Sequence, residues 1–259
     1  MRFACPVEYD GSEFSGWQRQ DHARSVQAHI EAALSKVADH PVQTACAGRT
    51  DAGVHATWQV IHFDSHAERS ERSWLLGTNS NLPEDVRLLS ITPVPEAFHA
   101  RFSAQARRYR YVILNRPVAS ALLRQRVTWT RQPLDVRRVS AAAVHLLGEH
   151  DFSSFRAVAC QAKSPVKTVH RLDVTRSGDY LYLDVEANAF LHHMVRNIAG
   201  VLMAVGRGER EPDWVGEVLD RRDRTQGGVT APAAGLYLVG VRYPDEYGIG
   251  PLGALPQFG

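Results

Sequence analysis

The stretch VQTACAGRTDAGVHATWQVIHF, residues 42–63, places two apolar segments on either side of a polar turn. Val42–Ala47 and Trp58–Phe63 are rich in the β-branched and aromatic residues typical of strands, and two glycines bracket the turn. The stretch therefore predicts two strands joined by a turn. The polar side chains between the glycines are Arg49, Thr50 and Asp51.

Strand and helix patterns alternate on both sides of this stretch. Ser25 is a suitable N-cap for a helix that ends near Val37, and the longest apolar stripe at helical spacing predicts a helix from about Ala189 to Val205. Shorter helices are predicted after Pro133 and at Trp214–Leu219. The other predicted strands are Arg2–Tyr9, Arg87–Val94, Arg107–Leu114, Val169–Arg176, Tyr180–Ala187 and Gly235–Val241. This mixture favours an α+β or a mixed α/β fold.

The length of 259 residues suggests one large domain or two ordinary ones. Each half carries strands around at least one helix, and no stretch has the composition of a linker. We therefore predict two subdomains, residues 1–104 and 105–259, that share a sheet.

Composition excludes several classes of protein. Hydrophobic residues make up 44% and charged residues 22%, which is typical of a globular chain. The apolar runs are too short to span a membrane, and Glu8 interrupts the N-terminus before a signal sequence can form. Cys5, Cys46 and Cys160 are too few and too scattered for a disulfide framework or a four-cysteine zinc site. A cytoplasmic location is the default expectation.

The formal net charge of +2 conceals an uneven distribution. Residues 1–100 carry a net charge of −5 and residues 139–259 a net charge of −2, whereas residues 101–138 hold ten arginines and one acid, Asp135, a net charge of +9. Such a block is a candidate surface for binding a polyanion.

Within this block, residues 106–111 interleave arginine with tyrosine. On a strand, Arg108 and Arg110 would share one face, and Arg107, Tyr109 and Tyr111 the other. Cations beside stacking rings are the pairing expected where a protein binds nucleic acid. The alternative is a solvated strand face, because 27 of the 30 basic residues are arginine and the composition itself is biased.

Two further positions carry chemistry. Asp51 lies two residues after Arg49 at a glycine-rich turn. A carboxylate kept ionised beside an arginine could act there as nucleophile or base, or Asp51 could form an Asx turn with a structural Arg–Asp pair. Arg196 lies on an apolar helix, so it needs a carboxylate partner such as Asp51 or a path to solvent. The neighbouring His192 and His193 would point in different directions on a helix, so we assign no metal site.

Seven ordered motifs resemble the TruA family of tRNA pseudouridine synthases along almost the whole chain. They lie at Tyr9–Gln18, Gly48–His55, His99–Phe102, Arg107–Tyr111, Asp151–Arg156, His192–Asn197 and Gly235–Leu238. One departure is Trp58, where family members often carry glycine.

The resemblance implies the pseudouridine synthase fold, an α+β fold whose two RRM-like halves share an extended mixed antiparallel sheet with helices packed on it. It implies a homodimer that cradles tRNA and isomerises uridines 38, 39 and 40 of the anticodon arm, without metal or cofactor. Asp51 would be the catalytic nucleophile or base and Arg196 its ion-pair partner. The residues that would bind substrate are Tyr109, Arg49, Leu236, Arg101, Arg107, Arg108 and Arg110.

Three alternatives compete with this interpretation. An RNA-binding module without catalysis would explain the arginine block but leave Asp51 and Arg196 without a role. A carboxylate glycosidase acting on small nucleosides would need a second catalytic acid and no basic patch. A pseudouridine synthase acting on other RNA positions would share all the residues above.

Overall fold

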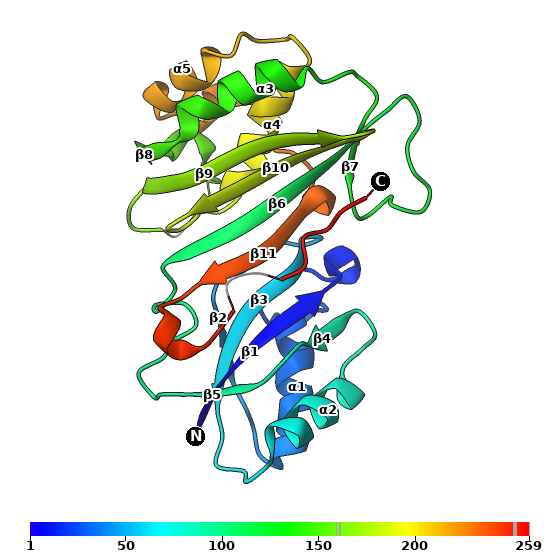
Figure 1. Cartoon of the computed structure of the whole chain (residues 1–259), viewed down its shortest axis with the longest axis vertical. Coiled ribbons are helices and arrows are strands. Elements are labelled where there is room, and N and C mark those ends of the chain that lie inside the picture. The colour runs from blue at the N-terminus through cyan, green and yellow to red at the C-terminus, as the bar shows by residue number, and fades with distance from the viewer. Residues whose placement is uncertain (159, 161, 251–252, 259) are drawn as a thin grey trace. The chain divides into compact units, whose positions relative to one another are not determined.

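The computed structural model of the chain describes residues 1–158, 160, 162–250 and 253–258 (Figure 1). Its elements fall into two units, each described here by itself. The first unit is Met1–Ala106 with Tyr237–Leu255, and the second is Arg107–Leu236 with Pro256–Gly259. The boundary lies beside the predicted division at 104 and 105, but the last strand returns to the first unit.

In the first unit the strands follow the order β4-β1-β3-β11. In chain order its elements are β1 (Arg2–Tyr9), α1 (Val26–Ala38), β2 (Thr44–Cys46), β3 (His55–Asp64), α2 (Glu71–Asn81), β4 (Val86–Leu88), β5 (Thr92–Val94) and β11 (Leu236–Arg242). β1 and β3 pair antiparallel from Arg2 opposite Asp64 onward, and β11 pairs parallel with β3, Tyr237 opposite His55. β2 pairs with β3, and β5 pairs with β1.

Aromatic packing anchors α2 to this sheet. The Trp74 ring is fully buried and lies 5.7 Å from the Phe3 ring and 5.2 Å from the Phe63 ring. The two helices lie side by side, and α1 contributes Ile30 and Leu34 to the core (Figure 1). Apolar side chains on both helices thus hold the strands that flank the Asp51 turn.

In the second unit the strands follow the order β6-β10-β9-β8. In chain order its elements are β6 (Ala106–Asn115), β7 (Thr128–Thr130), α3 (Val136–Ala143), β8 (Gly148–Asp151), β9 (Val166–Ser177), β10 (Tyr180–Ala187), α4 (Met194–Gly206) and α5 (Trp214–Arg221). β10 pairs antiparallel with both β6 and β9, so it is central, while β7 runs parallel to β6. The three helices lie together, with α3 against both α4 and α5 (Figure 1).

The α+β prediction is confirmed in each unit, and the predicted strand Tyr180–Ala187 has the observed bounds. The single strand predicted at Arg87–Val94 is wrong. The structure has two short strands there, and both pair with β1. Leu89 N donates to the Pro6 carbonyl, but Pro6 has no N–H to return the bond, and the pairing is interrupted over residues 89–91.

One helix is missing from the sequence predictions, and another begins later than predicted. The helix α2 is not evident from apolar periodicity, because only Trp74 and Thr78 of its residues are buried; its signal is Ser70, whose hydroxyl accepts from Ser73 N at 3.1 Å. The helix predicted from Ala189 begins only at Met194, because His193 adopts φ +63°, outside the right-handed region.

Among the described residues, the helices are too short and too polar to cross a membrane. Trp58, the departure from the family pattern, is partly exposed on β3. Its Nε1 donates to the Gly250 carbonyl at 2.9 Å, so this indole attaches the C-terminal tail to the first unit.

Candidate active site

The predicted site residues divide between the two units. Those in the first unit are Arg49, Asp51 and Arg101, and those in the second are Arg107, Arg108, Tyr109, Arg110, Arg196 and Leu236. Each group is described within its own unit.

Asp51 lies on the loop between β2 and β3, and a second loop clamps its backbone. Trp17 N donates to the Thr50 carbonyl at 3.0 Å, and the Thr50 hydroxyl lies 2.8 Å from the Tyr9 hydroxyl. Gly16 has φ +101°, and a Cβ there would lie 2.8 Å from the Thr50 carbonyl oxygen. Only glycine allows so close an approach, which explains why a Gly-Trp pair accompanies the aspartate loop.

The first residues of the same loop are held by a buried amide. Gln59 on β3 is fully buried; its Nε2 donates to the Gly48 carbonyl at 2.5 Å, and its Oε1 lies 3.3 Å from Gly48 N. The partly exposed Asp51 carboxylate is therefore carried on a backbone fixed on both sides. Such a fixed backbone restricts where the carboxylate can lie, as a catalytic group requires.

The buried His55 at the start of β3 contacts both Tyr237 and Asp10. The His55 ring stacks on Tyr237 with centroids 4.6 Å apart, and its Nδ1 lies 3.1 Å from Oδ1 of Asp10. This hydrogen bond lowers the pKa of Asp10 far below its usual range, although partial burial acts in the opposite direction. Asp10 also accepts from the Ser12 hydroxyl at 2.6 Å, so its carboxylate joins the N-terminal loop to β3.

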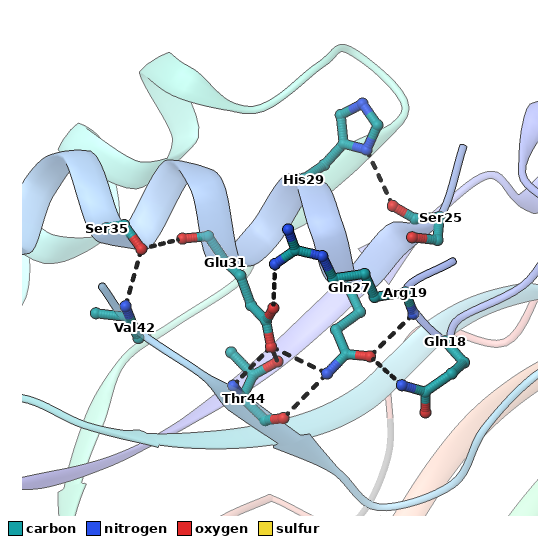
Figure 2. Close-up of polar contacts among 9 residues, drawn as sticks. All are labelled: Gln18, Arg19, Ser25, Gln27, His29, Glu31, Ser35, Val42 and Thr44. Atoms are coloured by element: carbon teal, nitrogen blue, oxygen red, sulfur yellow. Dashed lines mark hydrogen bonds and ion pairs between the residues drawn. The ribbon is translucent and has the colours of Figure 1, made fainter. Parts of the chain in front are cut away.

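Figure 2 shows a second polar network, centred on the buried Glu31 of α1. Its Oε1 accepts from Thr44 N at 2.9 Å and from Gln27 Nε2 at 2.9 Å, and its Oε2 lies 3.6 Å from the Arg19 guanidinium. The Gln27 Oε1 in turn accepts from Gln18 Nε2 at 2.9 Å and Arg19 N at 3.1 Å. One helix face thus joins the loop after Trp17 to the start of β2.

The positive charges of Arg49 and Arg101 both affect the pKa of the Cys46 thiol. Burial raises the pKa of the Cys46 thiol to about 12, and the positive charges of Arg49 and then Arg101 oppose that shift. Both arginines are exposed, so the first unit presents two cations near one point of β2.

In the second unit, Tyr109 lies on β6 opposite Val185 of β10. Its side chain is largely buried, and its ring meets the Phe190 ring edge to face at 5.0 Å. This contact fixes the plane of the ring, which a residue that stacks on a base requires.

The arginines of β6 differ in surroundings. Arg108 and Arg110 do share a face, as the alternation predicts: both reach the buried Asp184, Arg108 at 3.7 Å and Arg110 through hydrogen bonds of 3.0 and 2.7 Å. The Arg110 guanidinium also lies over the Tyr182 ring at 4.8 Å. Arg107 donates to the Asn188 carbonyl at 3.0 Å. The surroundings of Arg110 are those of a structural ion pair.

Arg196 lies in the first turn of α4 and is hydrogen-bonded to the segment 229–231, which packs on this helix. Its Nε donates to the Ala231 carbonyl at 2.9 Å, and Ala231 N donates to the Arg196 carbonyl at 3.1 Å. A Cβ on Gly200 would lie 1.8 Å from the Val229 carbonyl oxygen, so the segment lies directly on the helix. The buried Asn197 secures it, since its Oδ1 accepts from Thr230 Oγ1 at 2.6 Å. The predicted pairing of Arg196 with Asp51 stays a prediction.

Leu236 begins β11 and is 5% exposed, after a glycine whose Cβ would lie 2.6 Å from the Val112 carbonyl oxygen. The two histidines before α4 are closer than predicted. The rings of His192 and His193 lie 4.0 Å apart because neither residue is helical, so the geometric reason for excluding them as joint metal ligands is wrong.

Sequence reasoning missed the buried polar supports Gln59, Glu31, Asp184 and Asn197. Their only signal is a polar residue among the apolar residues of a strand or helix, a pattern that also occurs at solvated positions.

Comparison with known proteins agrees with the motifs. A family model described as tRNA pseudouridine synthase matches residues 6–103 and 142–244. The tRNA pseudouridine synthase A of Methylococcus capsulatus is 61% identical over 96% of this chain and 92% of its own length. The namesakes from Nitrosococcus oceani and Pseudomonas aeruginosa are 61% and 57% identical, each over 95% of this chain and over 95% and 87% of their own lengths.

Proposed function

Because the chain belongs to the tRNA pseudouridine synthase family, we propose that it isomerises uridine to pseudouridine at positions 38, 39 and 40 of the tRNA anticodon stem-loop. The observation that supports this most is the Asp51 loop, since it lies inside the matched region and its backbone is clamped by Trp17 and Gln59. A carboxylate held in this way suits a reaction at a single sugar carbon.

The reaction breaks the N1–C1′ bond of uridine, turns the uracil and joins C5 to C1′. The C5 proton leaves and N1 gains a proton, so no electrons and no chemical group enter or leave the substrate overall. Asp51 either adds to C1′ or removes a sugar proton to give a glycal. The target nucleotide must first leave its stack, because its reacting atoms are covered inside a helix.

The other roles follow the family resemblance. Arg196 pairs with the carboxylate of Asp51 and orients it, and Tyr109 stacks on the target uracil. Arg49 holds the flipped-out conformation, and Leu236 packs against the base. The exposed Arg101 is better placed to meet a phosphate than Arg110, whose guanidinium is already bonded to Asp184.

The enzyme is proposed to act in the cytoplasm as a homodimer that binds the anticodon arm. Sedimentation equilibrium tests the dimer: a monomer that retains full turnover contradicts it.

Asp51→Ala tests the catalytic assignment. Tritium release from tRNA labelled at C5 of uridine should be lost, while tRNA binding stays within about threefold, because the carboxylate acts on the reacting atoms. Glu68→Ala, an exposed acid of the same unit, is the matched control and should keep wild-type release. Near-normal release by Asp51→Ala contradicts the assignment.

Tyr109→Phe should retain turnover and Tyr109→Leu should not, since stacking needs the ring. Equal activity of the two variants contradicts a stacking role. Mapping pseudouridine in tRNA from a deletion strain separates positions 38–40 from other positions, and wild-type binding without any turnover would indicate an RNA-binding module instead.

A further inference from the structure

Phe102 is an exposed aromatic residue in the first unit. Its side chain is 75% exposed, whereas Phe3, Phe14, Phe63 and Phe98 are at most 3% exposed. A single exposed apolar residue is common on protein surfaces, so exposure alone indicates nothing. What distinguishes Phe102 is the construction of the turn that carries it.

The turn from His99 to Ser103 is fixed by hydrogen bonds at nearly every residue. His99 N donates to the Ser103 hydroxyl at 2.9 Å, and Ser103 N donates to the His99 carbonyl at 2.9 Å. Ala100 is held from both sides, because its N–H donates to His62 Nδ1 at 3.2 Å and its carbonyl accepts from the buried Tyr243 hydroxyl at 2.6 Å. The exposed ring therefore stands on a rigid support, and little conformational freedom remains to be lost when it binds a partner.

The His99 ring completes this support. Its Nδ1 lies 3.1 Å from Arg101 N and 3.4 Å from Phe102 N, so it accepts and the ring is neutral, with its proton on Nε2. Burial lowers the pKa of His99, and burial lowers the pKa of the adjoining His62 to about 4, in agreement with neutral rings. The His99 ring lies 4.3 Å from the Phe102 ring at 34°, which supports one side of it.

A positive charge lies beside the exposed ring. The Arg101 guanidinium carbon lies 5.6 Å from the Phe102 ring centroid. Arg49, together with Arg101, acts on the Cys46 thiol, so both cations lie on the same part of the first unit. A flat apolar ring beside a guanidinium group matches a nucleotide, whose base presents a π-face and whose phosphate is an anion.

We propose that Phe102 is a stacking subsite for an unpaired nucleobase of the RNA substrate, a nucleotide other than the uridine that is converted. The inference rests on the proposed function, since it assigns the RNA a second point of contact. The base must be unpaired and unstacked, because the faces of bases inside a helix are covered by their neighbours. Arg101 is the cation placed to meet the phosphate of that nucleotide.

Binding measurements test this with an RNA that cannot react. The probe is a tRNA transcript in which cytidine replaces uridine at positions 38–40, and fluorescence anisotropy gives its Kd. Phe102→Leu should weaken binding about 5- to 100-fold, the range found when one base loses an aromatic platform. Phe102→Trp should stay within about threefold of wild type, because it keeps a π-face. Leu76→Ala, on the exposed side of α2, is the matched control and should bind like wild type.

A second measurement locates the base. 2-Aminopurine is placed in turn at each anticodon-loop nucleotide; quenching on binding should be strong at one position in the wild type and lost there in Phe102→Leu. Three results overturn the proposal: wild-type affinity in Phe102→Leu, equal losses in the leucine and tryptophan variants, or a leucine variant whose only change is its oligomeric state, which would make this face an interface between copies. Tritium release by the wild type is scored separately, so a wild type that binds but does not convert tRNA contradicts the proposed function and leaves the subsite standing.

Discussion

Arg110 of β6 and Asp184 of β10 lie opposite each other on neighbouring strands and form an ion pair with two hydrogen bonds that is almost completely buried. Arg108 reaches the same carboxylate at 3.7 Å, so one acid compensates two cations. The arginine block of the sequence therefore contains members that stabilise the sheet as well as members at the surface.

Arg110→Leu should destabilise the fold by about 3–5 kcal/mol, because it leaves the carboxylate of Asp184 buried with a weaker partner. Urea unfolding measures this loss. The salt dependence of tRNA binding should stay unchanged in Arg110→Leu, whereas Arg101→Ala should reduce the slope by about one ion. A reduced slope with normal stability in Arg110→Leu would show that Arg110 binds phosphate after all.

Gly16→Ala should cost more stability and turnover than Gly178→Ala. Both glycines have positive φ, +101° and +52°, so both variants carry the backbone strain of about 1–2 kcal/mol. Only at Gly16 does the added Cβ also strike backbone, the Thr50 carbonyl at 2.8 Å, while nothing lies within 4 Å at Gly178. Tm and tritium release compare the two variants, and equal effects would show that close approach to the Asp51 loop is unimportant.

Glu31→Ala should destabilise the first unit by about 1.5–3 kcal/mol, since it removes the charged acceptor of Thr44 N and of Gln27. Amide exchange should accelerate at Thr44 and, through the released Gln27, at Arg19. Ser35→Ala, which loses only the hydroxyl bonded to Val42 N and the Glu31 carbonyl, is the matched control and should leave exchange at Arg19 unchanged. Protection of Arg19 in Glu31→Ala would contradict the coupling.

The Asp10 carboxylate should make the fold sensitive to acid. The hydrogen bond to His55 lowers its pKa in the folded protein, whereas an aspartate in the unfolded chain has a pKa of about 3.9. The stabilisation is therefore complete at neutral pH and declines as the pH falls through about 4 toward the folded pKa. Between pH 5 and pH 3, wild type should lose more unfolding free energy than Asp10→Asn, and parallel pH profiles would contradict this.

Periodicity and turn chemistry predict the strands well, as β10 and its Gly178 turn illustrate. They fail where an apolar stripe continues past the end of an element. Leu191 and Met194 are both buried, but the backbone between them turns through His193 and only Met194 begins the helix. They also fail at α2, which buries too little of its surface to show a period.

The candidate catalytic residues are recognised by motif, whereas their supports are not. Asp51 lies in a distinctive Gly-Arg-Thr-Asp motif, but Tyr9, whose hydroxyl bonds to Thr50 of its loop, is 41 residues from that partner in sequence. A pairing of distant polar groups depends on sheet register, and a single sequence does not specify that register.

The return of β11 to the first unit has a consequence for biosynthesis. Tyr237 lies beside His55 in the parallel pair with β3, although the two residues are 182 positions apart in the sequence. A ribosome that has released only the first hundred residues has therefore exposed a sheet in which β2 covers β3 at Ile61–Phe63, while the edge of β3 at His55 and Ala56 is still open. Other nascent chains can pair with this open strand edge until β11 emerges and covers it. The order of synthesis thus makes the region around the Asp51 loop among the last parts of the protein to be completed.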